Sequence, residues 1–225
     1  MNFRPLVFFC LLLFNLQCQI KKGIEHPSNA AFVALGLEEI TIEELQQGYL
    51  SGEFSVREVV QAYLGRIEAI DLDPNGPELN SVITINSEAI DIAASMDTQL
   101  LQSAEGVLPP LFGIPVLLKD NIDTKEGMPN TAGARAMAES RPYRDAFIVQ
   151  QLREAGAIIL GKTNLSEWAN FHSSFSSSGW SGLGGQTKNP YDRSRSPCGS
   201  SAGSGVAASA NLAMFTIGTE TNGSI

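Results

Sequence analysis

Histidine, cysteine and basic residues are all scarce in this chain of 225 residues. The two histidines, His26 and His172, have no cysteine or carboxylate partner at ligand spacing, so we expect no metal site. The three cysteines, Cys10, Cys18 and Cys198, predict no disulfide framework, because the first lies inside an apolar leader. The 15 basic residues against 24 acidic ones give a net charge of -9. This balance excludes the clustered basic surface that binds nucleic acid.

The apolar run at residues 6–14 is too short to cross a bilayer as a helix. Arg4 precedes it and polar residues follow it, which is the order of a secretory signal; the alternative is a buried first strand or helix. We therefore expect residues 1–17 to be a signal peptide. The protein would then be exported, either to the periplasm or as a membrane-anchored lipoprotein.

Cys18 follows this leader, as the lipidated cysteine of a bacterial lipoprotein does. Gln17 stands where that motif prefers a small residue, so lipidation of Cys18, ordinary cleavage and an uncleaved anchor all stay open. Membrane contact is expected only through this anchor. Residues 18–38 show little pattern and are expected to form a linker, with the folded domain at 39–225.

Two capping boxes open the folded part of the chain. Thr41 is followed by Glu44, and Ser55 by Glu58, so each pair predicts a helix start, and the two helices meet near Gly52. Strand and helix patterns then alternate. Strands are expected at 81–85, 114–118, 157–160 and 213–217, and helices at 87–103, 145–155 and 203–211.

This alternation predicts an α/β fold with a parallel sheet, in which ligands bind beyond the carboxyl ends of the strands. Lys119 and Ser224 both follow predicted strands. Residues 173–205 are rich in serine and glycine, as a flexible linker is. Trp180 and Tyr191 are unusual in a linker, so we expect an ordered loop over a site.

Serine chemistry is indicated at residues 199–203, Gly-Ser-Ser-Ala-Gly, which match a nucleophile elbow centred on Ser201. That mechanism needs a histidine later in the chain, and none follows His172. A phosphate-binding loop is excluded because no Lys-Ser or Lys-Thr follows these glycines.

A buried, neutral lysine can also activate a serine, and Lys119 ends an apolar strand where burial would disfavour its charged form. A lone lysine at a strand end more often pairs with a carboxylate, here Asp120 or Asp123.

Three segments decide between these hypotheses, because together they resemble the amidase signature family. They are GIPVLLKDNIDT at 113–124, RSPCGSSAGSGV at 195–206 and GTETNGSI at 218–225. The similarity runs from about residue 40 to the end of the chain. It implies a mixed, largely parallel sheet covered by helices on both sides, and an amidase that hydrolyses small-molecule carboxylic amides without a cofactor.

The resemblance also implies roles for single residues. Ser224 corresponds to the nucleophile, Ser200 to a bridging serine held by a cis peptide, and Lys119 to the base of a Ser-cisSer-Lys triad. The remaining implied site residues, which support the loop or bind the oxyanion and substrate, are Ser201, Thr221, Asn222 and Gly223. Cys198, expected to be a small buried residue, stands where the family often has glycine.

Family members are considerably longer than this chain, so the resemblance implies an amino-terminal fragment whose carboxyl-terminal part is missing. We expect residues 19–225 alone to be inactive. Two alternatives stay open. One is a protein like the glutamyl-tRNA amidotransferase subunit of this family, which works in the cytoplasm with partner subunits; the other is a non-catalytic remnant of the fold.

Overall fold

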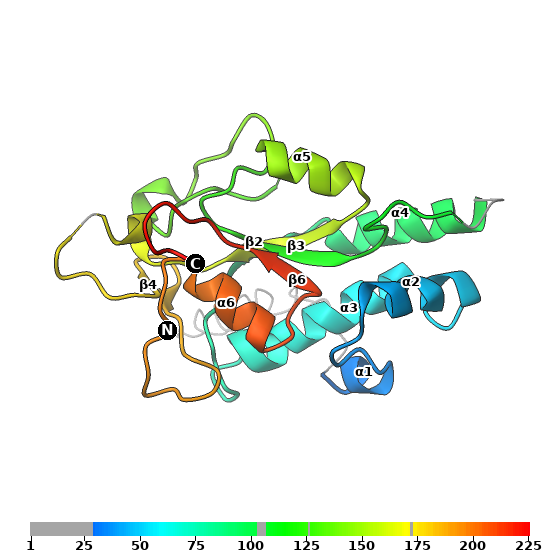
Figure 1. The fold of residues 1–225 in the computed structure, drawn as a ribbon, viewed down its shortest axis with the longest axis horizontal. Helices are drawn as coiled ribbons and strands as arrows, with labels where there is room; N and C mark the ends of the chain where they lie inside the picture. Colours follow the sequence, from blue (N-terminus) through cyan, green and yellow to red (C-terminus); the bar gives the residue numbers. More distant parts are fainter. Residues whose placement is uncertain (1–28, 103–106, 126, 172) are drawn as a thin grey trace, which may run out of the picture.

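A four-stranded sheet lies at the centre of the computed structural model, which describes residues 29–102, 107–125, 127–171 and 173–225 (Figure 1). Its strand order is β1 (Val82–Ile85), β3 (Ile158–Thr163), β2 (Pro115–Lys119) and β6 (Phe215–Ile217). Strand β2 is parallel to both β3 and β6, while β1 is antiparallel to β3. The expected mixed, largely parallel sheet is therefore confirmed.

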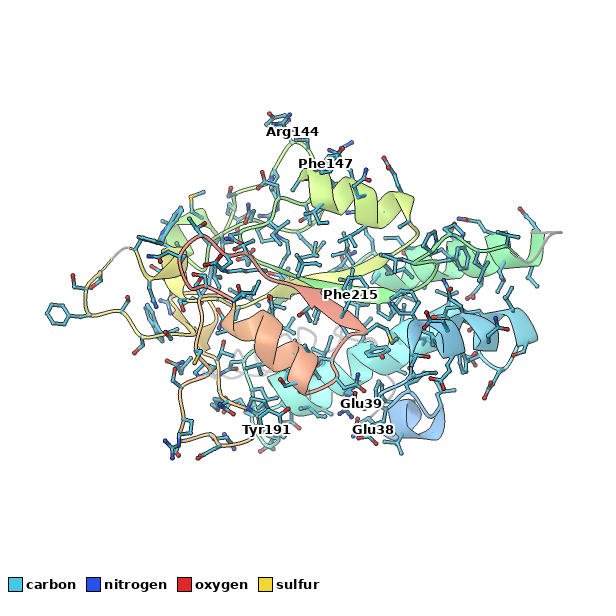
Figure 2. All side chains as sticks on the ribbon, in the orientation of Figure 1. Glu38, Glu39, Arg144, Phe147, Tyr191 and Phe215 are labelled. Atoms are coloured by element: carbon cyan, nitrogen blue, oxygen red, sulfur yellow. The ribbon has the colours of Figure 1, made fainter. Side chains whose placement is uncertain are left out.

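Helices cover both faces of this sheet (Figure 1). One core packs between the sheet and the helices α2 (Ile42–Ser51), α3 (Val56–Ile67), α4 (Ala89–Gln102) and α6 (Ala202–Ser209). A smaller core packs between the other face and α5 (Phe147–Glu154). Figure 2 shows Phe147 of α5 and the pair Glu38 and Glu39 on opposite sides of the molecule.

Both predicted capping boxes form. The side chain of Thr41 accepts the backbone N–H of Glu44, and that of Ser55 accepts the N–H of Glu58, with the glutamates bonding back to the caps. Helix α2 ends at Gly52, whose φ of 74° is left-handed, as a helix C-cap requires. Helix α3 continues into a π-helical turn, η1 (Glu68–Leu72).

The described part of the expected linker, residues 29–38, packs onto the domain instead. It contains helix α1 (Asn29–Ala34), and Phe32 and Leu37 are fully buried. The ring of Phe32 meets Tyr63 edge-on at 5.0 Å between centroids, and the Arg66 guanidinium lies 4.5 Å from the Phe32 ring centroid. Two apolar anchors in a short, low-pattern segment left no periodic signal for sequence reasoning to detect.

The predicted signal peptide and Cys18 lie outside the described residues. Within the described part of the chain, no helix has the length and apolar character that a membrane crossing requires.

The serine- and glycine-rich stretch is ordered, as expected. It contains a small antiparallel pair, β4 (Trp180–Ser181) with β5 (Gly185–Gln186). The hydroxyl of Ser181 donates to Asn164 at 2.7 Å, and that of Thr187 donates to the carbonyl of Asn80 at 2.9 Å. Two 3-10 turns, η2 (Arg135–Met137) and η3 (Glu167–Asn170), lie in the loops that precede it.

A register shift between β2 and β3 decides which side chains share a face. Val116 lies opposite Ile159, but Leu117 lies opposite Gly161, so β3 carries one extra residue at this point. Such a bulge reverses the alternation of the side chains that follow it. The last two residues of each strand therefore pair as Leu118 with Lys162, on the α5 face, and as Lys119 with Thr163, on the α6 face.

Candidate active site

Lys119 is the last residue of β2 and is fully buried. Its amino nitrogen lies 2.7 Å from the hydroxyl oxygen of Ser200, 3.0 Å from that of Ser201 and 3.1 Å from the carbonyl oxygen of Thr219. Within the described part of the chain, Lys119 forms no ion pair with a carboxylate. Burial lowers the pKa of Lys119 to about 8.

Asp120, the carboxylate that follows Lys119, points to the opposite face of the sheet and pairs with Lys162 at 3.6 Å. The alternative in which Lys119 pairs with Asp120 or Asp123 is therefore wrong. Sequence reasoning missed Lys162 as a partner because the strand was expected to end at residue 160, before the bulge had brought Lys162 to the face of Asp120.

Ser200 and Ser201 lie at the start of α6, where the peptide bond between Gly199 and Ser200 is cis. The carbonyl oxygen of Ser200 accepts the N–H of Ser166 at 3.0 Å, which ties this loop to the end of β3. Ser200 is 2% exposed, and its hydroxyl contacts only Lys119 among the described residues. The structure thus brings Ser200 and Lys119 together, as the resemblance implies.

Ser201 connects Lys119 to the loop after β6. Its hydroxyl lies 2.5 Å from the carbonyl oxygen of Ser224, and it accepts the N–H of Thr219 at 3.2 Å. Its own N–H donates to the same Ser224 carbonyl at 3.2 Å. Both donors of Ser201 are engaged inside the protein, so this residue holds the loop and has no free donor for a substrate.

Ser224 is 8% exposed, and its carbonyl makes the contacts to Ser201 just described. Its hydroxyl has no hydrogen bond to any described residue, and in particular none to Ser200. The structure therefore brings the backbone of Ser224 to the other two predicted catalytic residues, but not its side-chain oxygen.

The turn before Ser224 contains the three predicted oxyanion donors. Thr221, Asn222 and Gly223 are exposed, and Gly223 adopts a left-handed φ of 72° that suits glycine. The N–H of Gly223 donates to the carboxylate of Glu220. The N–H groups of Thr221 and Asn222 have no partner among the described residues and face no competition for an anion.

Two further sequence expectations concern cysteine and metal. Cys198 was expected to be buried, but it is exposed, with a left-handed φ of 60° in the loop before Ser200. In the part of the chain that the structure describes, no group of three or more histidine, cysteine, aspartate or glutamate side chains is placed to hold a metal ion.

Comparison with known proteins gives consistent results. Residues 58–225 match the family model described as Amidase. A probable amidase of Arabidopsis thaliana is 42% identical over 189 residues, covering 84% of this chain and 36% of the plant protein. A glutamyl-tRNA(Gln) amidotransferase subunit of Alkaliphilus metalliredigens is 42% identical over 190 residues, with the same two coverages. The X-ray structure of native peptide amidase from Stenotrophomonas maltophilia is 50% identical, with a TM-score of 0.79 over 85% of this chain and 38% of that one. This chain thus spans well under half the length of these relatives.

Proposed function

Because this chain belongs to the amidase family, we propose that the protein hydrolyses carboxylic amides through an acyl-enzyme intermediate. Ser224 would be the nucleophile, Ser200 the proton relay and Lys119 the base. The observation that carries the proposal is the state of Lys119. It is fully buried, 2.7 Å from the hydroxyl of Ser200, and has no carboxylate partner among the described residues to stabilise its charged form.

The hydrogen bonds around Lys119 support one direction of proton transfer. A neutral amine has two N–H donors and one lone pair. The Thr219 carbonyl can only accept, and the proton of Ser201 is directed to the Ser224 carbonyl. Neutral Lys119 would therefore donate to Thr219 and Ser201, and its lone pair would accept the proton of Ser200.

The chemical steps follow from this arrangement. The Ser224 oxygen attacks the amide carbon while its proton passes to Ser200, and the proton of Ser200 passes to Lys119. When the C–N bond breaks, a proton returns through Ser200 to the leaving amine. Water then attacks the acyl ester, which frees the carboxylic acid and restores Ser224. Rotation of the unbonded Ser224 hydroxyl toward Ser200 precedes the first step.

Negative charge develops on the carbonyl oxygen during attack and needs preorganised donors. We assign this role to the N–H groups of Thr221 and Asn222, which lie just before the nucleophile and have no partner among the described residues. The Gly223 N–H joins them when it is released from Glu220.

The test is labelling and turnover of the native protein. A serine-reactive fluorophosphonate should label it, and a peptide amide, chosen because one relative is a peptide amidase, should release ammonia. Both signals should be abolished in Ser224→Ala. The matched control is Ser209→Ala, an exposed serine at the end of α6 that bonds only to its own helix and should behave as wild type. Labelling that persists in Ser224→Ala would refute the assignment.

The similarity to an amidotransferase subunit supports a second candidate function. Such a subunit would pass the amide nitrogen to an acceptor, whereas a hydrolase releases it to solution. Free ammonia produced by the purified protein alone, without partners, would favour the hydrolase. A non-catalytic remnant would show neither labelling nor ammonia.

We also propose that residues 1–17 direct export, as their sequence pattern indicates. The protein would reside in the periplasm or be held at a membrane by a lipid on Cys18. The mass of the mature amino terminus tests this, because lipidation and simple cleavage give different masses, and an uncleaved leader in a cytoplasmic fraction would refute it.

A further inference from the structure

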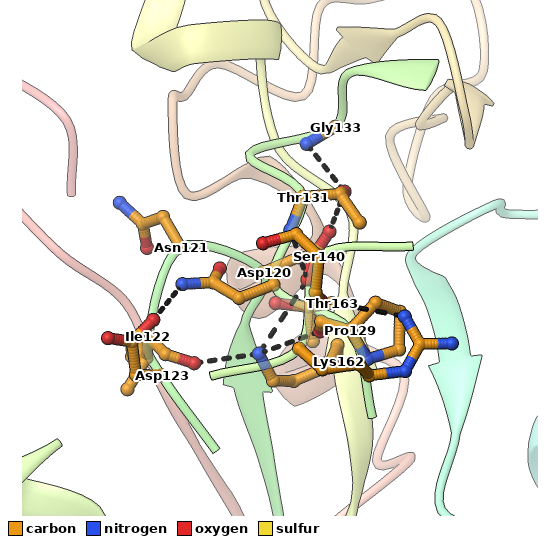
Figure 3. Close-up of polar contacts among 12 residues, drawn as sticks. Asp120, Asn121, Ile122, Asp123, Pro129, Thr131, Gly133, Ser140, Lys162 and Thr163 are labelled. Atoms are coloured by element: carbon orange, nitrogen blue, oxygen red, sulfur yellow. Dashed lines mark hydrogen bonds and ion pairs between the residues drawn. The ribbon is translucent and has the colours of Figure 1, made fainter. Parts of the chain in front are cut away.

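A buried ion pair lies on the face of the sheet opposite Lys119 and is not used by the proposed mechanism. Lys162 Nζ and Asp120 Oδ1 are 3.6 Å apart, and neither side chain is exposed (Figure 3). Lys162 also donates to the carbonyl oxygens of Ile122, at 2.7 Å, and Pro129, at 3.5 Å. One amino group therefore holds both ends of the loop that follows the base.

The loop is anchored from the side of Asp120 as well. The hydroxyl of Thr131 donates to the Asp120 carboxylate, and the Asp120 carbonyl accepts the N–H of Ala132 at 2.8 Å. The Ala132 carbonyl in turn accepts the N–H of Trp168 at 3.0 Å. These bonds link the residue next to the base with the segment after β3 that also holds Ser200.

The pair is close to the base through the backbone. Asp120 directly follows Lys119, and consecutive Cα atoms are about 3.8 Å apart. In low dielectric, an uncompensated carboxylate here would favour the ammonium form of Lys119, and an uncompensated ammonium would disfavour it. Asp120 and Lys162 together add no net charge, so the pair leaves burial as the dominant influence on the pKa of Lys119.

Other charged groups around the site are already compensated or absent. Asp123, on the loop after β2, accepts a bond from Asn130, and it faces Lys162, whose pKa it raises against the lowering effect of burial. Glu220, on the loop after β6, is bonded to the Gly223 N–H. Helix α6 has no charged residue, and on β3 the cation is Lys162 itself.

We propose that Lys162 is a positioning residue for the base Lys119. By pairing with Asp120 it cancels the charge beside the base and anchors the chain that follows it. The inference rests on the proposed function, in which Lys119 must be uncharged to accept a proton.

The test is the pH profile of kcat/KM for amide hydrolysis by the native protein and three variants. Lys162→Met leaves the Asp120 charge uncompensated and should move the midpoint of the acid limb up by about one pH unit. Asp120→Asn leaves the Lys162 charge and should move the midpoint down by about as much. The double variant should return it to the wild-type value. If Lys162→Met does not fold, Asp120→Asn, which keeps the side-chain size, decides alone.

The control is the exposed pair of Lys188 and Glu78, 2.5 Å apart. Lys188→Met should leave the midpoint unchanged, because solvent screens that pair. Loss of rate with unchanged midpoints in Lys162→Met and Asp120→Asn would show a purely structural role and overturn the inference alone. Absence of a Ser224-dependent reaction in the unaltered protein would refute the proposed function and the inference with it.

Discussion

Among single residues, Lys119 combines complete burial with three oxygen neighbours that have no formal charge. A buried lysine usually pairs with a carboxylate, and that role belongs here to Lys162. The two lysines are on adjacent strands but opposite faces, so one can be a structural cation while the other loses its proton.

We predict that kcat/KM for amide hydrolysis falls about tenfold per pH unit below pH 8 and is level above it. The pKa of Lys119 is lowered to about 8, and below that value the base becomes protonated and cannot accept the proton of Ser200. A pH titration of the initial rate measures this.

Lys119→Arg provides the companion variant, because arginine stays protonated throughout this range. It should lose about 100- to 10,000-fold in kcat/KM. An acid limb centred near pH 6 in wild type, or retained activity in Lys119→Arg, would contradict the assignment of the base.

Among the elements, α6 positions the serine loop, and its glycines differ in how much space surrounds them. A Cβ added to Gly203 would lie 2.3 Å from the Ser81 carbonyl oxygen and 2.4 Å from that of Asn164. A Cβ added to Gly205 would have no neighbour within 4 Å. The start of α6 thus approaches the backbone beside β1 and β3 so closely that Gly203 admits no side chain.

We predict opposite effects of alanine at these two positions. Gly203→Ala should lower the free energy of unfolding by about 2 kcal/mol or more, because backbone atoms must move, and should also reduce activity by shifting Ser200. Gly205→Ala, the matched control in the same helix, should raise stability by up to about 1 kcal/mol, since alanine favours helix. Urea unfolding measures both, and equal effects would contradict the close approach.

In the molecule as a whole, the sheet separates two cores, and Phe215 on β6 packs against both. Helix α1 extends the larger core through Phe32, so residues 29–38 belong to the same folding unit as the predicted site. The site itself lies at the carboxyl ends of β2 and β6, the edge at which α/β proteins commonly bind ligands.

We predict that Phe32→Ala lowers the free energy of unfolding by about 3–5 kcal/mol, because it removes a buried ring packed against Tyr63 and Arg66. Val33→Ala, the neighbouring and 59% exposed residue, should change it by less than about 0.5 kcal/mol. Similar unfolding midpoints in denaturant for both variants would show that α1 is not part of the cooperative domain.

Most elements were predictable because their signals are local. The capping boxes at Thr41 and Ser55, and the apolar runs of β2 and β3, lie within a few neighbouring residues. The family motifs likewise placed Lys119 and Ser200 in one site, and the structure brings them to 2.7 Å.

The partner of Asp120 and the packing of Phe32 were not predictable, because both depend on residues distant in the chain. One extra residue in β3 turns Lys162 to the face of Asp120 and Thr163 to that of Lys119. Without this bulge, side-chain alternation would place Lys162 on the face of Leu160, the same side as the base. A register shift between paired strands leaves no pattern in either strand alone, so only their packing settles which lysine is paired and which is free to act as a base.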